Sequence, residues 1–569
     1  MMREPQIHRA KARHGGLMAA IGIAATAYLA LAAGSARAAA SCSGDAITAL
    51  GVPNATIASA TAVAAGGSDP PYCDIVGMLK TMGDGAPAGA AQFEVKLPAD
   101  WNGKLLYLGV GGFAGALRPS VNGVDLQEAL PQGYALAISD TGHVGKGPFD
   151  AAWAIDGPGR PDRAKLADYY FRATHKVTVA AKLLVQRYYR VPGIRRAYFD
   201  GCSNGGRMGL MEAARYPDDY DGIIAGAPYM DVPGTNLSAL SRASAFIAAY
   251  IPPPLLAKVD AAVLESCDAE DGVRDGLIQN PARCAFDPAV LACKGSDAAD
   301  CLNESQVGAL KSYFAAIRDK RGHVVYHGMS VADLSSDFGF VPWSETSPPS
   351  DPEAAQPWGS ATPPIIWGAA DGTARFFVYA DPGFDTRRLD VKANIAGDDV
   401  IGRYRRTLAV GSTDDPARLA AFLGKGKKLI LYHGFADAAL SPYTTIHYYR
   451  SLAAKMGGYA RTQKQARLFM VPGLAHCRLG PGPNSFDMLG VLDAWVEHGT
   501  APDAILATKY VHDKPAEGPS RTMPLCKFPE AAHYDGKGDV NDARSWRCDA
   551  ADRRMEEVGR DGTGAGAAR

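Results

Sequence analysis

The chain has 569 residues, of which 59 are Lys or Arg and 60 are Asp or Glu, so its formal net charge at pH 7 is −1. Hydrophobic residues make up 47% of the chain and charged residues 21%, which is the balance of a globular protein with a sizeable core. Without its first 38 residues the chain is mildly acidic, which argues against nucleic acid or an anionic membrane as partner. The length exceeds one ordinary domain, so we expect two domains or a large insertion.

The first 38 residues have the pattern of a secretory signal peptide. A basic start is followed by an apolar stretch from Leu17 to Ala33, and Ala36-Arg37-Ala38 supplies a small-residue cleavage signal. A retained membrane anchor is the alternative, but the stretch is short and rich in alanine. Removal of residues 1–38 takes the formal charge to about −5. We expect a secreted or periplasmic protein without stable membrane association.

A buried strand followed by a glycine-rich loop is expected early in the mature chain. Leu105-Leu106-Tyr107-Leu108 is a short apolar run that leads directly into Gly109-Val110-Gly111-Gly112-Phe113. Glycine lets the backbone approach a ligand closely, so this loop is suited to donate an N–H group to an oxyanion. The N–H of Gly112 is the favoured donor and that of Gly111 the next; a plain glycine-rich turn is the alternative.

The pentapeptide Gly201-Cys202-Ser203-Asn204-Gly205 is the most informative motif of the chain. It matches the Gly-x-Ser-x-Gly nucleophile elbow, in which serine lies on a strained turn between a strand and a helix. Residues 195–199 are predicted to form the strand and residues 205–216 the helix. Ser203 is therefore the predicted nucleophile, and the backbone N–H of Asn204 is the predicted second donor of the oxyanion hole.

Residues 229–424 are predicted to be an inserted lid domain. Apolar strands stop near Ile223-Ile224-Ala225 and resume near Lys427, and the residues between them are rich in Pro, Gly, Trp and acidic side chains. An insertion at this point would cover the serine and shape a pocket for an acyl group. The aromatic candidates for that pocket are Trp343, Trp358, Trp367, Phe376 and Phe377, although core packing is the commoner fate of such side chains.

An acidic loop within the insertion is a candidate calcium site. Asp268, Asp271 and Asp275 would supply carboxylates, and Val273 and Leu277 would supply backbone carbonyls, because Ca²⁺ takes several oxygen ligands. The spacing is not that of an EF-hand, so the residues alone leave a solvated acidic turn as an equal alternative. The role of the ion would be structural.

The acid and the base of a catalytic triad follow the insertion in the order that the α/β-hydrolase fold requires. Residues 428–432 are predicted to be a strand whose following loop carries Asp437, and residues 466–471 a strand whose following loop carries His476. His476 would take the proton of Ser203, and Asp437 would orient the imidazole. The remaining histidines are assigned structural roles. His433 shapes the loop that carries Asp437, called the acid loop below, and His143 and His175 act as hydrogen-bonding partners.

Ten cysteines in an exported chain predict five disulfides, although the sequence leaves many pairings open. If Ser203 and His476 lie within hydrogen-bonding reach, Cys202 and Cys477 beside them are natural partners. The others pair most simply with their neighbours along the chain: Cys42 with Cys73, Cys267 with Cys284, Cys293 with Cys301, and Cys526 with Cys548.

These residues carry a family resemblance. Cys202-Ser203, Asp437 and His476-Cys477 resemble the tannase and feruloyl esterase family, which includes the bacterial mono(hydroxyethyl) terephthalate hydrolases. The similarity extends over nearly the whole mature chain. It includes Ser139-Asp140-Thr141-Gly142-His143, the stretch from Tyr170 to His175, the acidic loop, and the stretch from Tyr534 to Cys548. It implies calcium in the acidic loop, a lid that contacts an aromatic acyl group, and the five disulfides paired as above.

The predicted protein is therefore an α/β-hydrolase fold with a large inserted lid domain. We expect a serine carboxylic ester hydrolase that cleaves small-molecule esters of aromatic acids, of feruloyl or galloyl type, through an acyl-enzyme on Ser203. A peptidase on the same scaffold and an inactive calcium-stabilised binding protein are the alternatives. The expected parts are a signal peptide (1–38), the first part of the core (39–228), the lid (229–424), the second part of the core (425–557) and a disordered tail (558–569).

Overall fold

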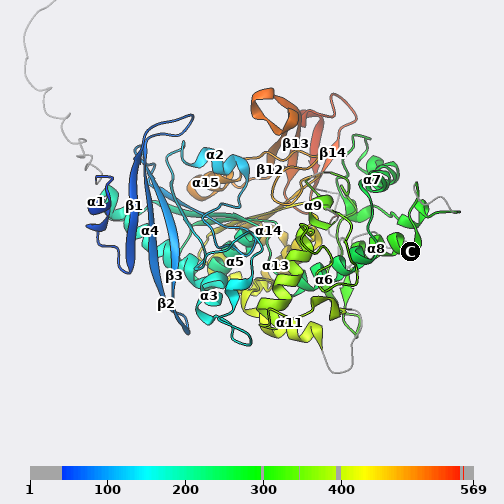
Figure 1. Cartoon of the computed structure of the whole chain (residues 1–569). Coiled ribbons are helices and arrows are strands. Elements are labelled where there is room, and N and C mark those ends of the chain that lie inside the picture. The colour runs from blue at the N-terminus through cyan, green and yellow to red at the C-terminus, as the bar shows by residue number, and fades with distance from the viewer. Residues whose placement is uncertain are drawn as a thin grey trace, which may run out of the picture. The chain divides into compact units, whose positions relative to one another are not determined.

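The computed structural model describes residues 41–550, except 296–299, 337, 345–346 and 392–398, together with Met555. The predicted signal peptide and the predicted tail lie outside the described residues, so both stay predictions. A central sheet, helices on its two faces and an inserted region make up the described chain (Figure 1).

Nine strands form the central sheet. In spatial order they are β1 (Ala55–Val63), β2 (Tyr72–Gly83), β3 (Ala86–Pro98), β5 (Ala135–Ser139), β4 (Lys104–Leu108), β6 (Arg196–Cys202), β7 (Gly222–Gly226), β10 (Lys428–Gly434) and β11 (Ala466–Val471). The strands from β5 to β11 run parallel. The first three are antiparallel to their neighbours and form one edge of the sheet.

Helices cover both faces of the parallel strands, which explains why those strands are continuous apolar runs. Every residue of β4, β5, β7 and β11 is buried. One face carries α2 (Gly123–Ala129) and α15 (Met488–His498); the other carries α4 (Ala173–Tyr189), α5 (Asn204–Arg215) and α13 (Pro442–Met456) (Figure 1). The short helices α1 (Gly44–Thr48), α3 (Arg163–Ala167) and α14 (Tyr459–Thr462) complete this part. The arrangement is the α/β-hydrolase fold predicted from the sequence.

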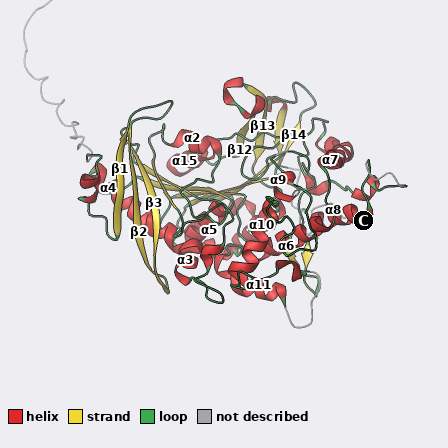
Figure 2. Ribbon diagram, in the orientation of Figure 1, coloured by secondary structure: helices red, strands yellow, loops and turns green. Residues whose placement is uncertain are grey.

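Between β7 and β10 the chain leaves the sheet and forms a mostly helical region (Figure 2). Its elements are α6 (Val232–Ala248), α7 (Pro253–Cys267), α8 (Glu304–Phe314), β8 (Ile317–Arg318), β9 (Val324–Tyr326), α9 (Phe340–Ser344), α10 (Ile365–Gly372), α11 (Val400–Leu408) and α12 (Ala420–Gly424). Residues of α7 and α8 share a hydrophobic cluster separate from the main core. This region corresponds to the expected insertion, whose limits at 229 and 424 stay predictions.

The strands after α15 lie outside the central sheet. They are β12 (Ala504–Tyr510), β13 (Pro519–Cys526), β14 (Ala531–Tyr534) and β15 (Trp546–Asp549), which form two antiparallel pairs. Met523 and Trp546 of these strands pack against Leu277 of the acidic loop. The segment 425–557, predicted as the second part of the core, ends in a small β-structure that packs against the insertion, and its limits stay predictions.

Among the described residues, no single helix combines the length and the apolarity needed to cross a membrane. The segments Val232–Ala248 and Pro253–Asp271 meet those criteria only together, with a bend of 118° between them. Nearly the whole length of α6 is buried inside the protein, which is the ordinary environment of a core helix.

Candidate active site

Ser203 lies on the sharp turn between β6 and α5. Its backbone has φ 63° and ψ −125°, a left-handed conformation that a non-glycine residue rarely adopts. The neighbouring glycines allow this turn, because a Cβ atom on Gly201 would lie 2.5 Å from the carbonyl oxygen of Gly205. The predicted nucleophile elbow therefore has the strand, the turn and the helix that the motif requires.

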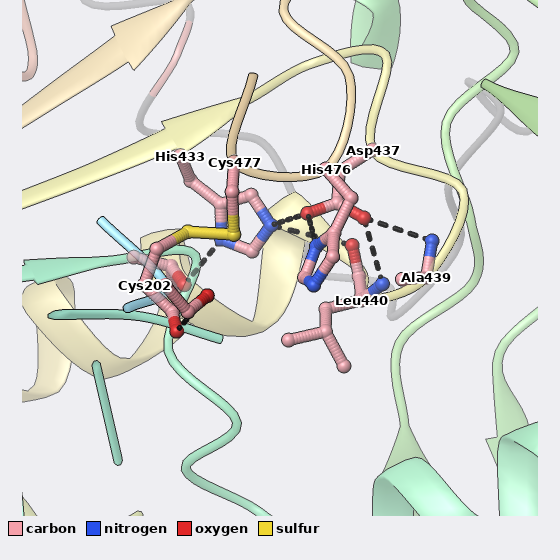
Figure 3. Close-up of a disulfide and its surroundings, with 9 residues drawn as sticks. Cys202, His433, Asp437, Ala439, Leu440, His476 and Cys477 are labelled. Atoms are coloured by element: carbon pink, nitrogen blue, oxygen red, sulfur yellow. Dashed lines mark hydrogen bonds and ion pairs between the residues drawn. A yellow bond between two sulfur atoms is a disulfide. The ribbon is translucent and has the colours of Figure 1, made fainter. Parts of the chain in front are cut away.

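Asp437 and His476 lie on the loops that follow the adjacent parallel strands β10 and β11. His476 Nδ1 is 2.7 Å from Asp437 Oδ2, and the N–H groups of Ala439 and Leu440 donate to Asp437 Oδ1 (Figure 3). Burial alone would raise the pKa of Asp437, but the charge of His476 and hydrogen bonds from His433 and His476 lower that pKa well below its usual range. The carboxylate is thus ionised and held in one orientation.

A second histidine contacts the same carboxylate. His433 Nε2 lies 3.1 Å from Asp437 Oδ2 and 3.3 Å from the carbonyl oxygen of Leu440, and its Nδ1 lies 2.7 Å from Thr445 Oγ1 (Figure 3). Since both partners of Nε2 are acceptors, Nε2 carries the proton. His433 therefore shapes the acid loop, as the sequence predicts, and it also donates directly to the carboxylate that holds His476.

A disulfide joins the nucleophile loop to the base loop. Cys202 and Cys477 are bonded, with Cα atoms 5.9 Å apart and a sequence separation of 275 (Figure 3). The other four bridges also form in the expected pairs, Cys42–Cys73, Cys267–Cys284, Cys293–Cys301 and Cys526–Cys548. Five disulfides indicate that the protein matures in an oxidising compartment.

Two adjoining cavities meet at Ser203 and His476, and both also touch Gly112, Phe149 and Trp343. The narrow pocket, about 60 Å³, is completed by Phe113, Asn204, Tyr229, Thr235, Asn236, Ala239, Arg242, Ile366, Ala369, Ala439 and Leu440. The wide cleft, about 660 Å³, runs along residues 110–121, 145–149 and 476–479, with Phe338, Pro342 and Ile365 opposite. The predicted nucleophile and base are therefore exposed to the same space.

The predicted oxyanion donors border these cavities. Gly112 has φ 59°, and a Cβ atom there would lie 2.1 Å from the carbonyl oxygen of Pro148, so only glycine fits this turn. Asn204 is the first residue of α5, so its N–H has no acceptor within the helix. Its side chain donates to Val110 O at 3.0 Å and accepts from the buried Arg207 at 2.8 Å. These bonds tie the glycine loop to the elbow; the oxyanion role itself stays a prediction.

The acidic loop has some of the features of a cation site. Asp268 accepts from the N–H of Gly276, and Asp271 and Asp275 accept from the N–H groups of Val273 and Leu277 at 3.1 and 3.0 Å. Asp271 Oδ2 is buried without a hydrogen bond, and burial, reinforced by the charges of Asp275 and Asp268, raises the pKa of Asp271 to about 7. Buried, mutually repelling carboxylates fit a bound cation.

The spacing of these carboxylates is looser than a finished site requires. Among the described residues, three ligand atoms lie within 4.8 Å of one another at His175, Glu212 and Asp219, outside this loop. In addition, Asp275 forms an ion pair with Arg521 at 3.3 Å. Calcium in the acidic loop therefore stays a prediction.

The other predicted residues divide between structure and site. His143 is buried, its Nε2–H donates to Phe113 O at 2.8 Å, and its ring stacks on Trp153; burial lowers the pKa of His143 to about 4. Of the aromatic candidates in the insertion, Trp343 lines both cavities and packs its ring edge-on to His476 at 5.1 Å. Trp358 and Trp367 belong to the core, and Phe377 packs on Phe113.

The sequence did not reveal the polar wall of the narrow pocket. Asn236 donates to Tyr229 Oη, and Arg242 donates to the carbonyls of Ala438 and Ala439 beside the acid. Tyr229 lies three residues after the end of β7, while Asn236 and Arg242 lie on α6, among mostly small or apolar residues that give no catalytic motif. Arg242 is the only charged residue of α6, and this is the one signal that sequence reasoning had available.

The fold, the elbow serine and the Asp437–His476 pair define the class of protein, an α/β hydrolase with the apparatus of an esterase. A family model described as tannase and feruloyl esterase matches residues 73–549. The chain belongs to the tannase and feruloyl esterase family, and it is a carboxylic ester hydrolase.

Individual relatives agree with this assignment. The chain is 34% identical over 542 residues to mono(2-hydroxyethyl) terephthalate hydrolase of Piscinibacter sakaiensis, covering 86% of this chain and 87% of that protein. It is 30% identical over 461 residues to a probable feruloyl esterase B-2 of Aspergillus flavus, covering 76% and 80%. The structure of feruloyl esterase B from Aspergillus oryzae superposes with a TM-score of 0.72 at 24% identity, covering 88% of this chain and 97% of that one, and supports the fold.

Proposed function

We propose that this protein is an exported serine esterase that cleaves esters of aromatic acids through an acyl-enzyme on Ser203. The observation that carries the proposal is the hydrogen-bonded pair of Asp437 and His476. The Cys202–Cys477 disulfide holds the loop of this pair's histidine beside the loop of Ser203. The five disulfides and the signal-like residues 1–38 support export.

In the proposed mechanism each side chain of the triad has one role. Asp437 is hydrogen-bonded to His476 Nδ1, so His476 Nε2 is the nitrogen that takes the proton of Ser203. Ser203 Oγ bonds to the ester carbonyl carbon, its proton passes to His476, and the carbonyl oxygen becomes an oxyanion that faces the N–H groups of Gly112 and Asn204. His476 then protonates the alcohol oxygen as the C–O bond breaks. Water repeats the sequence on the acyl-enzyme and releases the acid.

The narrow pocket supports an aromatic acyl group. Phe113, Phe149 and Trp343 supply flat aromatic walls, which suit a ring, and the polar side chains of Tyr229, Asn236 and Arg242 also line the pocket. The relatives named above are a terephthalate monoester hydrolase and a feruloyl esterase, so both are named for aromatic acids.

We also propose a structural calcium ion in the acidic loop, held by the carboxylates of Asp268, Asp271 and Asp275 and by the carbonyls of Val273 and Leu277. The buried, unpartnered Asp271 Oδ2 supports the proposal. The ion would neutralise the loop and stiffen its contact with β13. It supplies no step of the reaction.

The test is turnover of methyl ferulate, methyl gallate and a terephthalate monoester by the wild type and by Ser203→Ala, with an anilide of ferulic acid as the peptidase control. We expect ester cleavage by the wild type and its loss in a folded Ser203→Ala protein. Full activity in that variant would overturn the role of Ser203. Faster cleavage of the anilide would favour a peptidase, and failure of a fluorophosphonate to label Ser203 would favour an inactive binding protein.

A further inference from the structure

The wide cleft is lined by basic side chains from three separate loops. Arg118 follows the glycine loop, Lys146 lies in the loop after β5, and Arg478 lies two residues after His476. All three are exposed, and all three border the cleft that contains Ser203. Residues far apart in the sequence thus bring positive charge to one side of the candidate active site.

No described acidic residue lines this cleft. Within the described chain, the side chains of Arg118, Lys146 and Arg478 also form no ion pair with a carboxylate, although the protein has as many acidic as basic residues and many other surface cations are paired. Three unpaired cations in a concave surface focus a positive potential toward the reacting ester.

The shapes of the two cavities indicate which part of the substrate meets this positive potential. The narrow pocket is walled by aromatic rings and the helices α6 and α10, which suits the acyl group. The wide cleft has more than ten times the volume of the narrow pocket, about 660 against about 60 Å³, and is formed largely by surface loops. The alcohol must leave before water attacks the acyl-enzyme, so the wide cleft suits the alcohol.

We infer that the alcohol part of the substrate carries a carboxylate, as in an aromatic acid esterified to a hydroxy acid or a carboxylated polyol. The inference rests on the proposed function and deepens it. Ser203 Oγ bonds to the acyl carbon, the bond from that carbon to the alcohol oxygen breaks, and His476 returns the proton to this oxygen. The products are the aromatic acid and a free hydroxy-carboxylate, which Arg118, Lys146 and Arg478 attract through its charge.

A matched pair of substrates isolates the charge. Chlorogenate, the caffeate ester of quinate, and its methyl ester share the acyl group and the alcohol skeleton, and they differ in whether the quinate carboxylate is free and charged or a neutral methyl ester. We expect kcat/KM to be about tenfold higher for chlorogenate at low salt, because three exposed cations each contribute a few-fold. The preference should shrink with added salt, which screens exposed charges.

Matched variants assign the preference to the cleft. The triple variant Arg118→Gln, Lys146→Gln, Arg478→Gln should lose most of the preference for chlorogenate, while turnover of methyl caffeate changes by less than about threefold. The control variant Lys320→Gln, Arg321→Gln, Lys537→Gln removes the same charge from exposed positions outside the cleft and should keep the preference. Equal kcat/KM for the two esters, or a preference that survives the cleft variant, would overturn the inference.

Ligand binding separates this inference from the proposed function. Quinate and methyl quinate, titrated into Ser203→Ala protein and followed by ligand-observed NMR, test the cleft without turnover. We expect quinate to bind about tenfold more tightly, and the cleft variant to remove the difference. This result together with no hydrolysis of methyl caffeate would reject the aromatic acyl assignment and keep the cleft. Equal binding of the two ligands would reject the inference even if every ester is cleaved.

Discussion

The parallel strands and the inserted region have different roles at the candidate active site. Ser203, Asp437 and His476 lie on loops that directly follow β6, β10 and β11, and buried strand pairing holds those loops in place. The insertion has its own hydrophobic cluster and contributes the walls of the narrow pocket through α6, α9 and α10. Because one region positions the predicted triad and the other shapes the space around it, changes in the first should alter rate and changes in the second should alter selectivity.

The largest expected effect on kcat is that of replacing Asp437, which lies on the loop after β10. Asp437→Asn preserves the shape of the side chain but removes the charge and the acceptor that fix His476 Nδ1–H. We expect kcat to fall by about 10⁴, as the loss of a triad acid does in serine enzymes. Steady-state kinetics on an activated ester would measure it.

A matched substitution in the insertion serves as the control. Asp371→Asn in α10 alters a buried carboxylate that accepts from Thr386 and Arg375. It should lower the melting temperature and leave kcat within about threefold. Equal losses of kcat in both variants would contradict the idea that the parallel strands, and not the insertion, position the triad.

The Cys202–Cys477 bridge comes next. Cys202→Ala with Cys477→Ala should lower kcat/KM about 10- to 100-fold, because small displacements of reacting groups cost that much. It should also lower the free energy of unfolding by about 3–5 kcal/mol, since the bridge closes a long loop. Activity assays and denaturant titration measure the two effects.

Removal of the Cys293–Cys301 bridge is the comparison within the insertion. This bridge spans only 8 residues, so Cys293→Ala with Cys301→Ala should leave kcat/KM unchanged. If the two double variants lose the same activity, the Cys202–Cys477 bridge stabilises the fold without positioning Ser203 and His476.

Trp343 in the insertion should affect selectivity. Trp343→Ala removes a wall shared by both cavities, so kcat/KM for methyl ferulate should fall about tenfold while that for an acetate ester changes little. Trp358→Ala, a core change in the same region, should lower stability and keep the ratio of the two substrates. A constant ratio in Trp343→Ala would contradict a selective role.

The smallest expected effect is that of calcium removal. Chelation should lower the melting temperature by about 3 °C, because an ion that binds only the folded state stabilises it. Asp271→Asn should make the melting temperature insensitive to the chelator, and kcat should not respond in either protein. A melting temperature that is independent of calcium in the wild type would remove the proposed site.

The sequence anticipated the strand side closely, because its signals are local. β6, β10 and β11 are apolar runs that end at turns, and predicted strands at residues 428–432 and 466–471 correspond to Lys428–Gly434 and Ala466–Val471. The cysteine beside Ser203 and the one beside His476 also identified their own bridge.

The rest depended on tertiary contacts. Nothing near Arg118, Lys146 or Arg478 in the sequence shows that their loops meet at one cleft. Likewise Arg242 reaches the acid loop only because α6 packs against it, and β12–β15 form a separate β-structure although their alternating pattern resembles that of any other strand. The spacing of residues along the chain does not reveal such tertiary contacts.

The bridge between Cys202 and Cys477 also links catalysis to the history of the chain. Cys477 is synthesised 275 residues after Cys202, so the bond can form only after the whole insertion and the last central strand, β11, have been synthesised. A reducing cytoplasm keeps both thiols free. In an oxidising compartment the bond can form, and it then joins the loops that carry Ser203 and His476 covalently.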